Sequence, residues 1–182
     1  MFTLRLIENA KEMIAPVPEK IIWCYGVYQD IFADYSNIEF HEGVPALSLF
    51  DGKQRTLLVL DDLMDQVSDS VSQIFTKISH HKNLSVLYLT QNLFYKNKHS
   101  RTISLNSHFL VLFKNRRDIT QVANLARQMY PGKSAFLVEA FADASAGPYG
   151  YLLVDLRPQT AEEIRLRTNI FPGETSHVYV RK

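Results

Sequence analysis

The sequence has little of what several classes of protein require. It contains one cysteine, Cys24, which excludes an intrachain disulfide framework and a cysteine-based zinc cluster. No apolar run approaches the roughly 18 residues of a membrane-spanning helix. The formal net charge is only +1, so any contact with DNA requires a local basic patch. These features predict a soluble intracellular protein with no membrane partner, in which Cys24 is a small buried core residue.

The residues that are present favour one globular domain of the α/β class. An apolar content of 46% over 182 residues is enough for a sizeable core. Short apolar runs alternate with segments of helical periodicity, as in a mainly parallel sheet flanked by helices. The expected strands span residues 21–25, 57–60, 86–89, 109–113 and 151–155, with shorter extended pieces at 38–40 and 178–180. The expected helices span residues 1–15, 29–35, 67–78, 101–106, 119–129 and 134–144.

The chain is organised around the segment T-L-L-V-L-D-D, residues 56–62. Four consecutive apolar residues predict a strand that is buried on both faces, as in the middle of a parallel sheet. Two carboxylates follow at its C-terminal end, which is the form of a Walker B motif. In that interpretation Asp61 holds Mg²⁺ through its water shell, and Asp62 orients or deprotonates an attacking water. The alternative is a buried strand that ends in an aspartate capping the next helix.

Other polar side chains follow neighbouring apolar strands. Gln91 comes after the strand at 86–89, and Asn115, Arg116 and Arg117 come after the strand at 109–113. In a parallel sheet these groups and the two aspartates meet at one edge. A carboxylate pair, an amide and a guanidinium are the groups that phosphoryl transfer uses. Each also has a simpler interpretation, because Gln91 suits a loop and the arginines suit a solvated turn.

Three segments in this order resemble a known family. They are L-L-V-L-D-D (57–62), N-L-S-V through T-Q-N (83–92), and R-T-I-S-L-N through F-K-N (101–115). They are similar to the FtsK–HerA superfamily of P-loop ATPases, in particular the packaging ATPases of large DNA viruses and Polinton/Maverick-type transposons. The resemblance runs from Phe2 to about Gly173. It implies a RecA-type core that uses Mg²⁺ and ATP, and a homo-oligomeric, usually hexameric, ring. Such a ring moves double-stranded DNA into a capsid, in the host cytoplasm or nucleus.

The resemblance also implies roles for individual residues. Asp61 matches the metal-associated acid, and Asp62 takes the place of the catalytic base, which in this class is more often glutamate. Gln91 matches the sensor at the end of the strand next to Walker B. Arg116 or Arg117 is the expected arginine finger acting in trans, and Arg165 and Arg167 are further candidates for that finger.

The sequence departs from the family in one respect, because it contains no G-x-x-x-x-G-K-[ST] loop. Gly132-Lys133-Ser134 ends like one, but Arg127 stands where the first glycine is needed and no strand precedes it, so we expect a turn at a helix end. The pattern at 1–15 begins inside a helix that follows the P-loop in the family. We therefore expect residues 1–182 to form a single truncated ATPase domain, without the N-terminal strand and P-loop.

Two other functions stay open at this stage. The chain is alternatively a catalytically inactive, ATPase-derived module for oligomerisation or interaction. The third hypothesis is a metal-dependent nuclease. A two-metal nuclease usually needs three or four convergent acidic residues, and only Asp61 and Asp62 are expected at the sheet edge.

Overall fold

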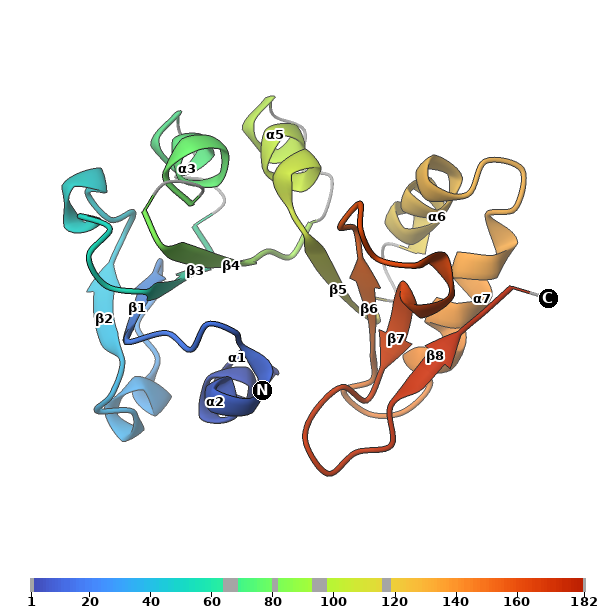
Figure 1. The fold of residues 1–182 in the computed structure, drawn as a ribbon, viewed down its shortest axis with the longest axis horizontal. Coiled ribbons are helices and arrows are strands. Elements are labelled where there is room, and N and C mark those ends of the chain that lie inside the picture. Colours follow the sequence, from blue (N-terminus) through green and yellow to red (C-terminus); the bar gives the residue numbers. More distant parts are fainter. Residues whose placement is uncertain (1, 64–68, 80–81, 93–97, 116–118, 182) are drawn as a thin grey trace. The chain divides into compact units, whose positions relative to one another are not determined.

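The computed structural model describes residues 2–63, 69–79, 82–92, 98–115 and 119–181. The chain divides into two compact units, Met1–Asn106 and Ser107–Lys182, each with its own four-stranded sheet (Figure 1). One sheet is parallel and flanked by helices, and the other is antiparallel. The α/β class is therefore confirmed, whereas a single ATPase domain over residues 1–182 stays a prediction.

The first unit contains the parallel sheet, with the strand order β2-β1-β3-β4. Its strands are β1 Lys20–Tyr25, β2 Glu39–Glu42, β3 Thr56–Asp61 and β4 Leu84–Leu89. Val59 in β3 lies opposite Trp23 in β1 and Leu87 in β4, which confirms that Val59 and Leu87 belong to neighbouring strands. The apolar run of β3 is at most 1% exposed, as expected for a strand that is enclosed on both faces.

Helices cover both faces of this sheet (Figure 1). Trp23 and Val59 pack with Leu4 and Ile7 on one face, and Leu58 packs on the opposite face with residues of the following helices. This alternation follows from the two-residue period of a strand. The helical elements are α1 Phe2–Glu8, α2 Ala10–Met13, the 3₁₀ turns Asp30–Asp34 and Leu47–Leu49, α3 Asp69–Gln73, the π-helical turn Ile74–Ile78, and α5 Lys98–Asn106.

Two helices of this unit differ from the sequence prediction. The helix expected over residues 1–15 is interrupted at Asn9, whose side-chain amide donates a hydrogen bond to the backbone carbonyl of Arg5 (2.8 Å). The backbone N–H of Asn9 donates to the same carbonyl (3.1 Å), so the interruption is a local change of backbone angles at Asn9 (φ −99°, ψ 17°) and not a lost helical hydrogen bond. The helix expected over residues 67–78 is described from Asp69 and continues from Ile74 as a π-helical turn. Residue 67 lies outside the described residues.

The second unit corrects the prediction that all the apolar strands share one parallel sheet. Its strands β5 Phe109–Phe113, β6 Tyr151–Asp155, β7 Leu166–Thr168 and β8 His177–Tyr179 form a separate antiparallel sheet in that order. Two helices, α6 Ile119–Met129 and α7 Ala135–Ala144, lie between β5 and β6. A single helix between two strands brings the chain back to the end of the sheet at which the first strand began, so the two strands are parallel. A second helix after a turn reverses the chain once more, so β6 runs antiparallel to β5.

Gly132 has a φ of 73° in the turn between α6 and α7, so Gly132-Lys133-Ser134 is a helix-end turn, as predicted. β7 and the 3₁₀ turn Glu162–Ile164 lie after residue 155, where the sequence predicted only a short extended piece at 178–180. Cys24 is fully buried, and burial raises the pKa of its thiol to about 12. None of the helices described is long and apolar enough to cross a membrane.

Candidate functional site at the C-terminal edge of the parallel sheet

The two aspartates stand at the C-terminal end of β3, between the ends of β1 and β4. Asp61 is the last residue of the strand and is half-buried, whereas Asp62 is exposed. Asp62 has a φ of 53°, in the left-handed region that aspartate tolerates better than most residues. The backbone therefore turns at Asp62, as the chain leaves the sheet.

Gln91 joins this edge from the neighbouring strand. The turn after β4 is held by Thr90, whose hydroxyl accepts a hydrogen bond from the backbone N–H of Asn92 (3.2 Å) and donates one to its carbonyl (3.0 Å). Gln91 extends from this turn, and its Nε2 lies 3.4 Å from Oδ1 of Asp62. The structure thus brings Asp62 and Gln91 together, in agreement with the prediction that they meet at one edge of the sheet.

Trp23 is part of the site, although no sequence motif pointed to it. Its indole Nε1 donates a hydrogen bond to Oδ2 of Asp61 at 3.2 Å, and its side chain is fully buried. Trp23 lies opposite Val59, so the indole reaches along the sheet face to the residue two positions further on. The contact depends on the register between β1 and β3, which local sequence does not encode.

The electrostatics of this edge are those of two adjacent carboxylates. Burial raises the pKa of Asp61 above its ordinary value, the hydrogen bond from Trp23 opposes that rise, and the negative charge of Asp62 adds to it. Burial also raises the pKa of the Tyr88 hydroxyl, with a further contribution from the charge of Asp62. The site thus concentrates negative charge that a bound cation would offset.

Gly26 gives the backbone of Asp62 the room it needs. Its N–H donates a hydrogen bond to the carbonyl of Asp61 (3.1 Å) just beyond the end of β1. A Cβ at position 26 would lie 2.8 Å from the carbonyl oxygen of Asp62, a distance shorter than Cβ atoms show in proteins. The two strand ends therefore approach each other closely only because residue 26 has no side chain.

We expect Gly26→Ala to lower the free energy of unfolding by about 1–3 kcal/mol, because the new methyl group displaces the backbone at Asp62. Urea denaturation measures this effect. Gly147→Ala is the matched control, since a Cβ at position 147 meets no atom within 4 Å. Equal stability of the two variants would contradict the close packing of Gly26 against Asp62.

The arginine candidates fall into two groups. Arg116 and Arg117 lie outside the described residues. Arg165 and Arg167 belong to the second unit and donate hydrogen bonds within it. Arg165 Nη1 donates to the carbonyl of Asp155 (2.6 Å), and Arg167 Nη2 donates to its Oδ2 (3.1 Å). These contacts use donors that an arginine finger would need for a nucleotide.

Asp155 is the centre of an ion-pair network that sequence reasoning missed. Its side chain is fully buried and receives two hydrogen bonds from the Arg157 guanidinium, from Nε to Oδ1 (3.0 Å) and from Nη2 to Oδ2 (2.7 Å). The Arg157 guanidinium also lies over the ring of Phe109, 4.6 Å from its centroid. The Asp155 carboxylate is thus paired inside the unit with both Arg157 and Arg167, which is typical of a structural network.

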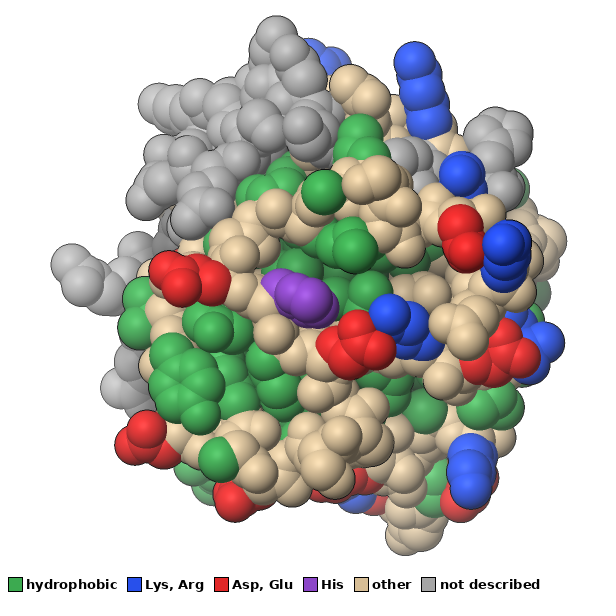
Figure 2. Space-filling model, turned by 90° about the vertical axis from the view of Figure 1, so that its left-hand side faces the viewer, with side chains coloured by type: hydrophobic (Ala, Val, Ile, Leu, Met, Phe, Trp, Pro, Cys, Tyr) green, Lys and Arg blue, Asp and Glu red, His purple; other side chains and the backbone are tan. Residues whose placement is uncertain are grey.

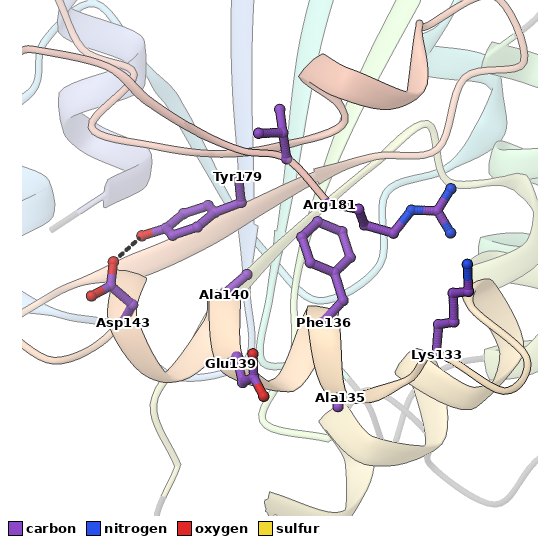
Figure 3. A pocket seen from close by; sticks show the side chains of 9 residues that line it. Lys133, Ala135, Phe136, Glu139, Ala140, Asp143, Tyr179 and Arg181 are labelled. Carbon is purple, nitrogen blue, oxygen red and sulfur yellow. Dashed lines mark hydrogen bonds between the residues drawn. The ribbon is translucent and has the colours of Figure 1, made fainter.

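The second unit also has a concave surface along α7 (Figure 3). This groove of about 830 Å³ is lined by residues of α7 and of the chain around the end of β8. The Tyr179 hydroxyl donates a hydrogen bond to Asp143 across it (2.7 Å), and burial together with this carboxylate raises the pKa of Tyr179 to about 12. Among the described residues, none of those predicted for the catalytic site lines this groove.

The described part of the chain contains no cluster of three or more histidine, cysteine, aspartate or glutamate side chains that could hold a metal ion by itself. Asp61 and Asp62 therefore offer a pair of carboxylates, which suits a cation that takes its other ligands from water or a phosphate. The larger acidic cluster of a two-metal nuclease is not found among these residues.

When the chain is compared with family models, curated proteins and solved structures, none of the three comparisons gives a match.

Proposed function

We propose that this chain carries the Walker B and sensor elements of an ATP-hydrolysing, DNA-packaging motor of a virus or virus-like transposon. In this proposal Asp61 associates with Mg²⁺, Asp62 activates the attacking water, and Gln91 positions that water or senses the γ-phosphate. The observation that carries the proposal is the 3.4 Å approach of Gln91 Nε2 to Asp62 Oδ1. It occurs at the C-terminal edge of a parallel sheet, where α/β proteins bind their ligands.

The position of β4 supports the same proposal. β4 pairs with β3 only, among the described strands, although its residues Val86 to Leu89 are apolar on both faces and half-buried. Such a run is typical of an interior strand. The family resemblance places the P-loop strand centrally in the sheet, and a strand added beside β4 would make it an interior strand. For the chain alone we expect low stability or aggregation through this edge.

The proposed partners are double-stranded DNA, capsid components and further copies of the chain in a ring, with Arg116 or Arg117 acting on the nucleotide of a neighbouring copy. These partners rest on the resemblance. On the face of the first unit in Figure 2, acidic and basic side chains are interspersed. Ion pairs of this unit include Lys20–Glu39 (2.9 Å) and Arg55–Glu19 (2.8 Å). A DNA-binding basic surface is therefore expected elsewhere, since phosphate contacts need unpaired lysine and arginine.

A second candidate function is a catalytically inactive, ATPase-derived module that serves oligomerisation or interaction. It is favoured by the absence of a G-x-x-x-x-G-K-[ST] loop from the sequence. Without that loop the backbone N–H groups and the lysine that cradle the phosphates are missing.

The nucleotide sequence of the transcript upstream of the Met1 codon separates the two candidates. The motor proposal expects an in-frame segment that encodes an apolar strand followed by G-x-x-x-x-G-K-[ST]. Stop codons or unrelated sequence at that place would overturn the motor proposal for this chain and favour the inactive module.

A further inference from the structure

The Asp61 carboxylate is held asymmetrically. Its Oδ2 accepts the hydrogen bond from Trp23 Nε1, whereas no described residue donates a hydrogen bond to its Oδ1. The indole N–H is a donor only, so it fixes one carboxylate oxygen and cannot itself serve as a ligand for a cation. Among the described residues, one oxygen of Asp61 thus accepts a hydrogen bond and the other accepts none.

The indole is itself immobilised by its neighbours. Trp23 is fully buried, and its ring packs against Phe32 at 5.8 Å and Phe40 at 6.2 Å between ring centroids. Phe32 and Phe40 also stack on each other, with centroids 4.5 Å apart. In a close-packed core such rings have little freedom to turn. The core packing therefore sets the direction of the N–H bond, and the hydrogen bond in turn orients the carboxylate.

We propose that Trp23 is a positioning residue for Asp61, holding Oδ2 so that Asp61 presents Oδ1 alone to a divalent cation at this edge. The inference rests on the proposed association of Asp61 with Mg²⁺. A carboxylate held in this way makes a one-oxygen contact, directly or through a water, as Mg²⁺ and Mn²⁺ accept in their octahedral shells. The two-oxygen contact that Ca²⁺ often takes from aspartate or glutamate is disfavoured, because the hydrogen bond occupies a lone pair of Oδ2.

The sequence provides a direct probe, because Trp23 is the only tryptophan of the chain. The indole N–H therefore gives a single cross-peak in a ¹⁵N–¹H spectrum of the full-length chain. We expect this peak to shift in Asp61→Asn, since a neutral amide replaces the charged acceptor. We expect Mn²⁺ to broaden it in the wild type and not in Asp61→Asn. Asp51→Asn, which changes an exposed carboxylate elsewhere in the unit, should leave both properties unchanged.

Metal affinity then tests the positioning role itself. Electron paramagnetic resonance of free Mn²⁺ measures binding to the wild type, Trp23→Phe and Phe75→Leu. Trp23→Phe keeps a ring in the core and removes the donor, and we expect it to weaken Mn²⁺ binding about tenfold or more, as residues that orient metal ligands commonly do. Phe75→Leu disturbs the core on the other face of the sheet and leaves both the donor and the rings packed against it in place, so its Mn²⁺ affinity should stay within about twofold of the wild type.

The outcomes separate this inference from the proposed function. If the wild type binds no Mn²⁺ through Asp61, the metal role of Asp61 fails, and the proposed function loses its metal site. If Mn²⁺ binds through Asp61 and Trp23→Phe binds it as tightly as the wild type, only the positioning role of Trp23 is overturned. Should Trp23→Phe fail to fold, the Asp61→Asn spectrum decides, because an unmoved indole peak would show that Trp23 does not hold Asp61.

Discussion

Calorimetric titration of this chain with Mg-ATP is expected to show no binding tighter than about 1 mM. In P-loop enzymes the loop supplies several charge-assisted hydrogen bonds to the β- and γ-phosphates and a direct hydroxyl ligand for Mg²⁺. Each such hydrogen bond contributes very roughly 1.5–3 kcal/mol, so the loss of several moves a micromolar site beyond the millimolar range. Asp61 and Asp62 do not replace these contacts, because two carboxylates repel a nucleotide that carries no bound metal.

A phosphate-release assay on the same protein is expected to show no turnover above buffer. Micromolar binding of Mg-ATP, or turnover that disappears in Asp62→Asn, would show that another segment of the chain supplies the phosphate contacts. Either result would contradict the expectation that residues 1–182 form a truncated domain.

Asp155→Asn is expected to lower the free energy of unfolding of the second unit by about 3–5 kcal/mol. Asp155 is fully buried and pairs with Arg157 (2.7 Å) and Arg167 (3.1 Å). Removing one partner of a buried ion pair leaves the other charges without compensation. Glu39→Gln is the matched control, because Glu39 pairs with Lys20 at the surface, and surface pairs contribute about 1 kcal/mol or less. Urea denaturation compares the two variants, and equal losses would contradict the buried network.

The same network predicts a pH dependence. Burial by itself would raise the pKa of Asp155, but hydrogen bonds from Arg157, with smaller contributions from Thr160 and the Arg157 charge, bring it below its ordinary value. The stabilisation is therefore complete above the unfolded pKa, near 4, and is lost as the pH falls through the folded pKa. We expect the difference in stability between the wild type and Asp155→Asn to be constant from about pH 8 to 5 and to shrink below about pH 4. A difference that grows on acidification would contradict the lowered pKa.

The fold was predictable from sequence where local pattern determines the outcome. The run of β3, with Leu57 to Leu60 apolar on both faces, predicted a central parallel strand, and those residues are at most 1% exposed. The run of β5 looks alike but lies in an antiparallel sheet, and Phe109 and Phe113 are 44% and 48% exposed. Apolarity does not distinguish the two environments. The turn at Pro131-Gly132 was the available signal, because a second helix after it reverses the direction of the following strand.

At the candidate site, too, the local sequence pattern does not determine the environment of a side chain. β3 and β6 both end in an aspartate after an apolar run, and the sequence does not separate their roles. Asp61 is half-buried and receives the Trp23 indole N–H at an open edge, whereas Asp155 is fully buried between arginines. The difference arises in part from partners on other strands, Trp23 on β1 and Arg167 on β7, whereas Arg157 follows Asp155 by two residues in the chain. The proximity of Asp62 and Gln91 was predictable, because the ends of neighbouring parallel strands always meet at one edge.

The proposed catalytic role of this edge is tested most directly by ATP hydrolysis in a chain extended at its N-terminus by an apolar strand and a G-x-x-x-x-G-K-[ST] loop. The measurement is Mg²⁺-dependent phosphate release by the extended chain and by its Asp62→Asn variant, with Asp51→Asn as a control at an exposed carboxylate. If Asp62 activates the attacking water, Asp62→Asn should reduce the rate by about 10²–10⁴-fold, with nucleotide binding retained. If the Asp62→Asn variant binds ATP and hydrolyses it at the wild-type rate, the edge formed by Asp61, Asp62 and Gln91 is not the catalytic centre of an ATPase.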